Sequence, residues 1–546
     1  MRLSENIRWI YNTSRGVRAG ISLFIVLGFA SVFSSLLFIW LTKSLIDMAT
    51  HGAEVSSIRL YIIFLAAAII FQQVIVVVRG RISNRTSTKL MNRLRLELFE
   101  TVMRSQWSGK ELRHTGDIVN RIESDSRTVS EALCITIPSI FITLVQFLAS
   151  FRFLHILDAR LSWVIVAIMP IALIVSKRYL FTMRKLTQAI RSTDSAVQSH
   201  IQEQIQNRTV INTVGDVGGS VQTLQGWSNT LLEQTMRRVN YTLFSRTTVQ
   251  LGFGVGYIVA LSWGIFGLQS GAVSFGVLTA FLQLVAQIQR PSVELATQIS
   301  QTAQCTASID RLEDIFEMKA EENSSQQRVL SGELGIEAKD LDFEYADGAG
   351  RKILSAFNYN FSPNRLHVII GHTGVGKSTL VRLMLGLLKP NRGSINIYNN
   401  SAESVECSAA TRQNFVYVPQ GNTLMSGTIR QNLLLAKPSA TEEELREALH
   451  TAAADFAWEL PQRLETICTE RGAGLSEGEA QRIAIARGLL QDGGVILLDE
   501  PTSALDSNTE ELLMSRLTKY AQNRTLIVVT HRLASAQHCA SVIKMG

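Results

Sequence analysis

One segment sets the fold class: Gly371-His372-Thr373-Gly374-Val375-Gly376-Lys377-Ser378-Thr379, directly after the apolar run Leu366–Ile370. Its spacing matches GxxxxGK[ST], in which a strand leads through a glycine-rich loop into a helix. The glycines allow backbone N–H groups to turn toward phosphate oxygens, and the start of the helix adds positive potential. Lys377 is expected to bridge the β- and γ-phosphates, and Ser378 to bind Mg²⁺. The segment therefore predicts an ATP-binding loop in an α/β nucleotide-binding fold.

A second apolar strand is predicted at Val495–Leu498, and it ends in two acids, Asp499 and Glu500. Beside a phosphate-binding loop, Asp499 is placed to hold Mg²⁺ through water, and Glu500 to polarise the attacking water as a general base. Two acids can also simply cap the end of a strand. The GxxxxGKS loop upstream favours the hydrolytic interpretation.

The first 290 residues carry the apolar part of the chain. The whole sequence is 46% hydrophobic and 18% charged, against about 25% charged in an ordinary soluble protein. Apolar runs at roughly 20–42, 60–78, 133–153, 161–176, 247–268 and 275–289 predict six membrane-spanning helices. A buried helix of a soluble protein could mimic any single one of them.

The distribution of basic residues predicts the topology. Eleven Lys and Arg lie between Arg79 and Arg127 and nine between Lys177 and Arg246, whereas Gln269–Ser274 carries no charge. The positive-inside rule then places both termini and the two long loops in the cytosol, with the chain in the cytoplasmic membrane. The net charge of +7 does not indicate nucleic-acid binding, because the basic residues flank apolar runs. Five scattered cysteines are expected to be free thiols.

The predicted domain boundaries follow these changes in composition. Residues 1–18 are expected to form an interfacial helix, with a disordered tail as the alternative. Residues 19–316 form the transmembrane domain, 317–333 a linker rich in Glu, Gln and Ser, and 334–546 the nucleotide-binding domain. Each long loop, if it forms two helical arms, reaches roughly 35–40 Å into the cytosol at 1.5 Å per residue.

Two further motifs extend the pattern: Leu475-Ser476-Glu477-Gly478-Glu479-Ala480-Gln481-Arg482 and Glu500-Pro501-Thr502-Ser503-Ala504-Leu505-Asp506. With six predicted spans ahead of one such domain, the whole chain resembles a half-size exporter of the ABC transporter family. The resemblance implies a membrane all-α six-helix transmembrane domain plus an α/β P-loop NTPase (ABC ATPase) domain. It also implies ATP-driven export or flipping of a substrate by a dimer, and working catalytic residues.

The same resemblance implies roles for individual residues. Tyr345 would stack on adenine, Gln420 would sense Mg²⁺ and the membrane domain, and His531 would hold the γ-phosphate and the water. Thr469–Gly472 resembles a cross-contact loop, and Thr115–Asp125 and residues around Asn207–Asn212 resemble coupling segments. The residues implied to bind ATP are Tyr345, Gly371, His372, Thr373, Gly374, Val375, Gly376, Lys377, Ser378, Thr379 and Gln420, and those implied to bind Mg²⁺ are Ser378, Gln420 and Asp499. Catalysis is implied for Glu500 and His531. The signature residues, which would face a partner's ATP, are Leu475, Ser476, Glu477, Gly478 and Glu479, and Asp506 is the D-loop residue.

The signature departs from the family's usual LSGGQ, since it reads LSEGE. Glu477 and Glu479 suit the start of a helix but oppose ATP phosphates, which suggests weakened closure of the ATP sandwich. The alternative is that both side chains point to water. A homodimer is favoured; one subunit of a heterodimer with a weakened ATP site and an ATP-gated channel or regulator are the alternatives.

The substrate is expected to be small or amphipathic, and the sequence does not identify it. Several polar residues within or near the predicted spans are candidates to line a cavity or to bridge helices. They are Gln72, Gln73, Gln146, Arg152, Gln250, Gln283 and Gln287.

Overall fold

The computed structural model describes residues 9–106, 115–321, 327–345, 352–372, 374–468, 474–531 and 541–545, with the side chains of 115, 168–181, 184 and 523 left aside. The chain divides into two compact units, Met1–Phe99 with Gly116–Phe316 and Glu100–Thr115 with Glu317–Gly546. His114, at the predicted tip of the first loop, lies outside the described residues.

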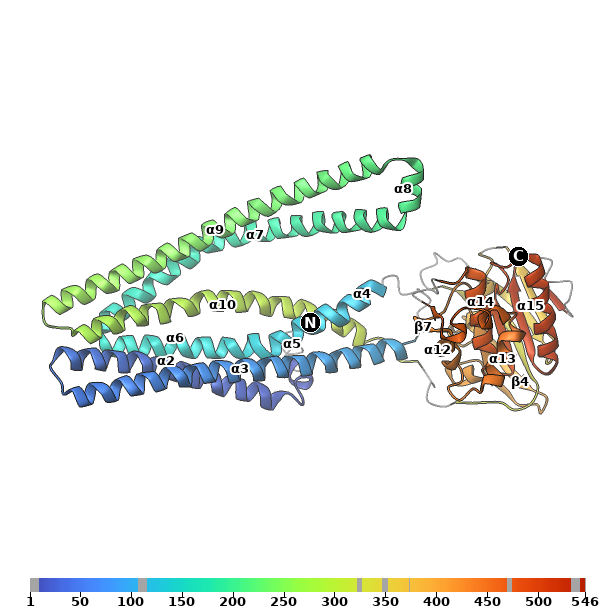
Figure 1. Ribbon diagram of the computed structural model, residues 1–546, viewed down its shortest axis with the longest axis horizontal. Helices are drawn as coiled ribbons and strands as arrows, with labels where there is room; N and C mark the ends of the chain where they lie inside the picture. The colour runs from blue at the N-terminus through green and yellow to red at the C-terminus, as the bar shows by residue number, and fades with distance from the viewer. Residues whose placement is uncertain are drawn as a thin grey trace. The chain divides into compact units, whose positions relative to one another are not determined.

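The first unit is helical (Figure 1). Residues 9–13 form a short helical stretch. The elements that follow are α2 (Arg18–Thr50), α3 (Val55–Arg104), α4 (Thr115–Asn120), the π-helical turn η1 (Arg121–Asp125), α5 (Ser126–Glu131), the π-helical turn η2 (Ala132–Thr136), α6 (Ile137–Leu157), α7 (Ala159–Gln206), α8 (Arg208–Val214), α9 (Val217–Gln269) and α10 (Phe275–Phe316).

Four of these helical stretches are long and apolar enough to cross a membrane, judged by length and composition within the described part of the chain. They are Arg18–Thr50, Val55–Arg104, Gly116–Leu157 and Val217–Gln269. The two other predicted spans, 161–176 and 275–289, lie in α7 and α10. Side chains 168–181 of α7 are not described, and glutamines interrupt the apolar stretch of α10.

The helical unit has an apolar interior and an apolar exterior. Leu154, Leu161, Ala260 and Phe281 are fully buried where α6, α7, α9 and α10 pack together. By contrast, Val77 on α3 is 69% exposed, and it belongs to a long series of exposed apolar side chains on that helix. Exposed apolar surface of this extent is unfavourable in water and typical of helices that face lipid.

Several helices are much longer than a membrane requires. α9 has 53 residues and is therefore about 80 Å long, whereas about 20 residues span the hydrocarbon layer. α7 and α9 lie side by side and are joined at their far end by the short helix α8 (Figure 1). α8 ends at Gly215, whose φ of 80° is left-handed, and Asp216 caps α9 by accepting a hydrogen bond of 3.2 Å from the Gly219 N–H. α8 thus contains most of the predicted second coupling segment.

The predicted first coupling segment is hydrogen-bonded to α10 through the buried carboxylate of Asp125. The side chain of Asp125 is 6% exposed, and Arg311 on α10 donates to its two oxygens at 2.8 and 2.5 Å. The Ser308 hydroxyl donates to the same carboxylate at 2.9 Å. Because Arg311 lies five residues before the end of α10 at Phe316, this cluster connects the coupling segment to the helix that leads out of the unit.

The second unit contains two main sheets and their helices. Its strands are β1 (Leu334–Glu344), β2 (Lys352–Phe361), β3 (Leu366–Gly371), β4 (Arg392–Asn399), β5 (Ser404–Glu406), β6 (Phe415–Val418), β7 (Gly427–Thr428), β8 (Ile467–Cys468), β9 (Val495–Asp499), β10 (Thr525–Thr530) and β11 (Ser541–Met545). Its helices are α11 (Lys377–Met384), α12 (Ile429–Leu434), α13 (Glu442–Thr451), α14 (Glu477–Leu489) and α15 (Ser507–Tyr520), with 3₁₀ turns at Ala409–Asn414, Asp455–Trp458, Arg463–Glu465 and Ala521–Asn523.

The larger sheet is parallel and buried. Its order is β11-β3-β10-β9-β6, and every pairing is parallel. The smaller sheet, β2-β1-β4-β5, is antiparallel. Strands β9 and β10 are buried along their whole length, as expected for parallel strands covered on both faces. The apolar runs predicted as strands in the sequence are the central strands of this sheet.

Candidate functional site

The functional residues gather where four parallel strands end. β3 leads into the 371–379 loop, β9 ends at Asp499, β10 is followed by His531, and β6 is followed by Gln420 two residues after Val418. Since the strands are parallel neighbours, their carboxyl ends share one edge of the sheet, which is where open α/β sheets bind ligands. Residues spread over 160 positions are thereby brought together.

The glycine-rich loop has the backbone conformation that its glycines allow. Gly374 and Gly376 have φ values of 86° and 107°, a left-handed region that disfavours other residues. Gly376 is the N-cap of α11. The buried Lys377 ammonium donates to the carbonyls of Gly371 at 2.7 Å and His372 at 3.2 Å. Lys377 is therefore folded over the loop, and Thr373 lies outside the described residues.

The first acid of β9 contacts the loop directly. The Ser378 hydroxyl donates to Asp499 Oδ2 at 3.1 Å. Burial raises the pKa of Asp499; the Ser378 hydrogen bond opposes this shift and the Glu500 charge adds to it. Lys377 adds a weaker opposing effect. Arg382 acts in the same direction as Lys377. The pair Ser378–Asp499 thus presents a hydroxyl and a carboxylate side by side, with the carboxylate buried.

The second acid, Glu500, is held from three sides. Gln420 donates to one carboxylate oxygen at 2.8 Å, and His531 Nδ1 lies 3.3 Å from the other. The backbone of Glu500 has a φ of 49°, which is unfavourable for a residue other than glycine. The buried Gln481 side chain, from α14, donates to the Glu500 carbonyl at 2.6 Å. Gln481 therefore fixes the peptide that orients the carboxylate.

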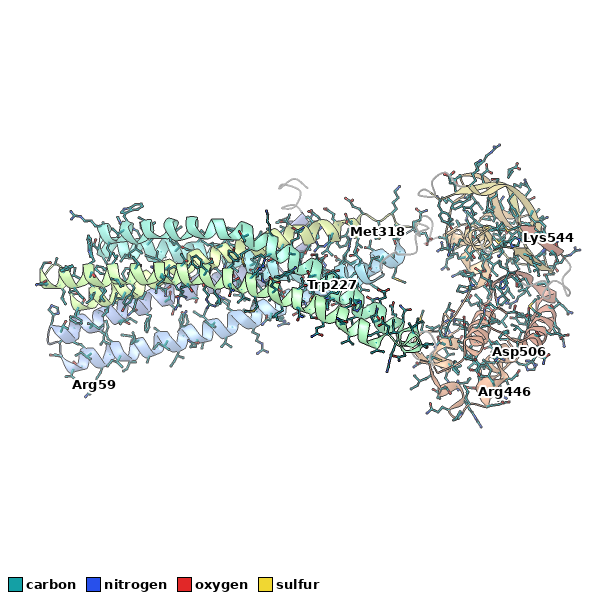
Figure 2. All side chains as sticks on the ribbon, turned by 90° about the horizontal axis from the view of Figure 1, so that it is seen from above. Arg59, Trp227, Met318, Arg446, Asp506 and Lys544 are labelled. Atoms are coloured by element: carbon teal, nitrogen blue, oxygen red, sulfur yellow. The ribbon has the colours of Figure 1, made fainter. Side chains whose placement is uncertain are left out.

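These residues line one cavity of about 880 Å³. Tyr345 reaches it from the end of β1, and its hydroxyl lies 3.2 Å from the Thr379 hydroxyl. Figure 2 labels Lys544, which also lines this cavity. The predicted residues in the lining are Tyr345, Gly371, His372, Gly374, Gly376, Lys377, Ser378, Thr379, Gln420, Glu500 and His531. Val375 packs instead against the core, and Asp499 lies behind Ser378.

Four lining residues were not predicted as site residues: Ile353, Ile370, Lys544 and Met545. Lys544 and Met545 reach the site because β11 pairs in parallel with β3, which places Met545 opposite Gly371. A Cβ on Gly371 would collide with the Met545 carbonyl. No local motif marks these positions, because the strand pairing alone brings them there. Gln481 is in a quoted motif, but only its contact with Glu500 shows its position in the site.

The signature residues occupy the start of α14 and do not line this cavity within one chain. The Ser476 hydroxyl accepts from the Glu479 N–H at 3.3 Å, and Glu479 Oε2 accepts from the Ser476 N–H at 2.8 Å. This reciprocal pair is a capping box. Glu479 is thus a helix-capping residue, whereas Glu477 is exposed. A Cβ on Gly478 would lie 2.8 Å from the Ala504 carbonyl, so the close packing there requires glycine.

Asp506 is the N-cap of α15 and accepts from the backbone N–H groups of Asn508 and Thr509 at 3.1 and 3.0 Å. Hydrogen bonds from the Thr509 hydroxyl and N–H hold the pKa of Asp506 below its ordinary value. Figure 2 labels Asp506 on the same unit as Lys544. Leu475, the first signature residue, precedes α14 and packs, partly buried, against the core. Thr469–Gly472, the predicted cross-contact loop, lies outside the described residues.

A buried parallel sheet, a phosphate-type loop and adjoining acids define an ATP-binding ATPase unit joined to an apolar helical unit. The chain belongs to the ABC transporter family: the family model of the ABC transporter transmembrane region matches residues 20–292, and the family model described as ABC transporter matches residues 354–503. It has the architecture of a half-size exporter, with a helical transmembrane domain followed by one ATPase domain that couples ATP hydrolysis to transport.

Named relatives share this organisation. The chain is 25% identical over 514 residues to the putative multidrug export ATP-binding/permease protein YgaD of Bacillus subtilis (strain 168), covering 92% of this chain and 88% of that protein. It is 28% identical over 510 residues to the ATP-dependent lipid A-core flippase of Desulfotalea psychrophila, with the same coverage. The solved structure of a bacterial Atm1-family ABC exporter with ATP bound has a TM-score of 0.78 at 21% identity, covering 98% of this chain and 94% of that one.

Proposed function

We propose that this chain is one half of a dimeric exporter that uses ATP bound between two ATPase domains to move a small or amphipathic substrate out of the cytosol. Residues 19–316 would form the transmembrane domain and 334–546 the ATPase domain, joined by the linker 317–333. The observation that carries this proposal is the convergence of Lys377, Ser378 and Glu500 on one cavity in a chain of the exporter family.

Each residue of the site has a chemical role in this proposal. Lys377 and the loop N–H groups bind the phosphates, and Tyr345 contacts the adenine. Glu500 accepts the proton of the attacking water, since its carboxylate is positioned by Gln420 and His531. His531 holds the γ-phosphate and the water. A general base held by neighbouring side chains loses little orientational freedom when the substrate binds.

We also propose that the site takes Mg²⁺ with the nucleotide. The Ser378 hydroxyl and the Asp499 carboxylate are 3.1 Å apart, and hydroxyl and carboxylate oxygens are ligands that Mg²⁺ accepts. Gln420 is a third candidate ligand. Within the described part of the chain, no group of three or more His, Cys, Asp or Glu could hold a metal alone, which agrees with the few protein ligands that Mg²⁺ uses beside phosphates. Bound Mg²⁺ would neutralise phosphate charge and would remove the cost of ionising the buried Asp499.

The second half of each ATP site would come from a partner chain. Ser476 and Gly478 lie outside the cavity of their own chain at the start of α14, where N–H groups and a hydroxyl can meet a phosphate. A symmetric homodimer would pair both cavities with both signatures. A heterodimer in which LSEGE completes a weakened site is the alternative; a purified chain that hydrolyses ATP without a second kind of subunit would decide for the homodimer.

We infer that the protein resides in the cytoplasmic membrane, with both termini and the ATPase domain cytosolic. The basic loops support this orientation. The coupling segments, 115–125 and α8, would then lie on the cytosolic side and pass closure of the ATPase domains to the helices. The Asp125–Arg311 ion pair would make the first segment and α10 move together.

Reconstitution of the purified protein in liposomes tests the proposal. ATP should drive directional, vanadate-sensitive accumulation of substrate, and Glu500→Gln should abolish both hydrolysis and accumulation while ATP binding persists. Removal of Mg²⁺ by a chelator should stop hydrolysis. An ATP-dependent flux that only equilibrates the substrate would instead indicate a gated channel.

A further inference from the structure

A second cavity lies inside the helical unit, between α2, α3 and α10. Its volume is about 380 Å³, within the range of about 300–1,000 Å³ typical of small-molecule sites. It falls within residues 20–292, the part that matches the family's transmembrane region. Its polar lining comes from Ser34 and Ser35 of α2, from Gln72 and Gln73 of α3, and from Gln283, Gln287 and Arg290 of α10.

Arg290 is the only charged side chain among the residues that define this cavity. Positions 283, 287 and 290 follow the i, i+4, i+7 spacing that places side chains on one face of a helix. Arg290 is 15 residues from Phe275, the first residue of α10, so it lies about 22 Å along that helix, and its side chain is exposed in the single chain. Within a transmembrane domain, an ionisable side chain that faces a cavity usually marks a functional site.

The described side chains do not supply a counter-ion for Arg290. No described carboxylate lies within 4.0 Å of the Arg290 guanidinium. Glu294, one turn further along α10, interacts electrostatically with Arg79. Arg290 thus faces the cavity as a cation whose counter-ion is not provided by its neighbours.

The glutamines are only partly satisfied by one another. Gln146 donates to Gln287 Oε1 at 2.6 Å, which leaves the Gln287 NH₂ group available as a donor beside Arg290. Gln72 donates to the Ser31 hydroxyl at 3.0 Å, and its own oxygen is buried with no partner among the described residues. A ligand that supplies an acceptor would therefore pair with the Arg290 guanidinium and the Gln287 NH₂ group, whereas the Gln72 oxygen, itself an acceptor, would need a donor such as a hydroxyl or amide N–H.

We propose that this cavity binds the anionic headgroup of an amphipathic substrate, with Arg290 pairing with its carboxylate, sulfonate or phosphate. A guanidinium presents paired donors to such groups. Apolar side chains from Phe38, Ile39 and Ile69 in the same lining suit the adjoining hydrocarbon portion. The proposal rests on the exporter function above and adds a substrate class to it.

Two fluorescent probes that differ only in charge test this inference: 11-(dansylamino)undecanoate and its primary amide. The full-length protein in lipid nanodiscs is titrated without nucleotide, and binding to empty nanodiscs is subtracted. The carboxylate should bind the wild-type protein at least about tenfold more tightly than the amide, as expected for a charge-assisted pair. Arg290→Gln should remove that preference by weakening carboxylate binding alone, and Arg290→Lys should restore part of it.

Arg152→Gln is the matched control, because Arg152 lies on α6 and does not line the cavity; it should leave both affinities unchanged. Equal binding of the two probes to the wild-type protein would overturn the proposal, as would an equal loss in the Arg152 and Arg290 variants. Retained binding of the amide probe shows that the helical unit of a variant is folded. A missing carboxylate preference in a protein with Glu500-dependent ATPase refutes the headgroup site alone, whereas a preference without any ATPase refutes the exporter proposal alone.

Discussion

Replacing Glu479 by glutamine or by alanine separates two effects that this residue combines. Its carboxylate accepts a hydrogen bond of 2.8 Å from the Ser476 N–H and so completes the capping box of α14. It also places a negative charge beside the hydroxyl that, in the proposed dimer, meets the partner's ATP. Glutamine keeps the acceptor and removes the charge, whereas alanine removes both.

The two effects are measured by different quantities: the capping bond by the melting temperature, and the charge by the KM for ATP. Loss of a helix N-terminal cap costs about 1 kcal/mol, which corresponds to a melting shift of about 2–4 °C in a domain of roughly 200 residues. A charge at ~8 Å from a phosphate charge opposes it by about 2 kcal/mol at an effective dielectric constant of ~20. Screening over a Debye length of about 8 Å reduces this to just under 1 kcal/mol, or about a fourfold change in the KM for ATP.

ATPase titrations and thermal unfolding of the purified variants measure both effects. Glu479→Gln should lower the KM for ATP about fourfold, and the change in KM should grow at low ionic strength. Its melting temperature should fall less than that of Glu479→Ala, because glutamine loses the charge at the helix start but keeps the capping acceptor. Glu479→Ala should show the same change in KM with a melting temperature about 2–4 °C lower. Glu477→Gln is the control for a charge that makes no capping bond. An unchanged KM at all salt concentrations in Glu479→Gln would refute the electrostatic argument, and an unchanged melting temperature in Glu479→Ala would refute the cap.

Three further predictions follow from the packing. Gln481→Leu removes the donor that holds the Glu500 carbonyl at 2.6 Å and should lower kcat roughly tenfold or more with little change in the KM for ATP. Equal effects on kcat and KM would indicate a general loss of structure. Gln481→Glu also lacks the donor and should not rescue kcat. Asp125→Ala removes a buried carboxylate that pairs with the half-exposed Arg311 and leaves the buried Ser308 hydroxyl without its acceptor, so it should destabilise the protein by about 1–3 kcal/mol. Asp117→Ala removes an exposed carboxylate from its pair with Arg121 and should cost less than about 1 kcal/mol. Similar melting temperatures for the two variants would contradict this difference. Burial raises the pKa of Asp499 above its ordinary value of 3.8. Between these two pKa values the folded state binds more protons than the unfolded state, so the free energy of unfolding falls as pH rises through that interval. Asp499→Asn should therefore melt at a higher temperature than the wild type at pH 7 without nucleotide or Mg²⁺, and this gain should vanish below pH 3.8; a gain that persists there would contradict burial as its cause.

The sequence predicts the elements around the candidate ATP site because local motifs specify them. The loop 371–379 specifies its own strand, turn and helix, and apolar residues before Asp499 specify a buried strand. Two such strands in one α/β sheet must end at the same edge if they are parallel. The helical spans are predicted for a similar reason, since runs of apolar residues alone indicate them. The family's match to residues 20–292 agrees with this interpretation.

Contacts between distant segments could not be predicted in the same way. Lys544 reaches the cavity only because β11 adds to the edge of β3, and Gln481 reaches Glu500 only through the packing of α14 against the sheet. Arg290 lies just beyond the apolar run 275–289, so the sequence marks it as the end of a span. The structure instead places it in one cavity with Gln283 and Gln287, because all three share one face of a helix that continues to Phe316.

If each ATP site combines Glu500 of one protomer with the partner's Ser476, two inactive variants should restore each other within one dimer. Glu500→Gln and Ser476→Ala chains, carrying different tags, are co-expressed, and the mixed dimer is isolated by both tags. One of its two sites then contains both native residues, and its ATPase should approach about half of the wild-type rate, far above either parent. In the control, one chain carries both substitutions and its partner is wild type, so that both sites are defective and activity should be lost. Equal activity of the mixed dimer and this control would contradict an ATP site shared between two chains.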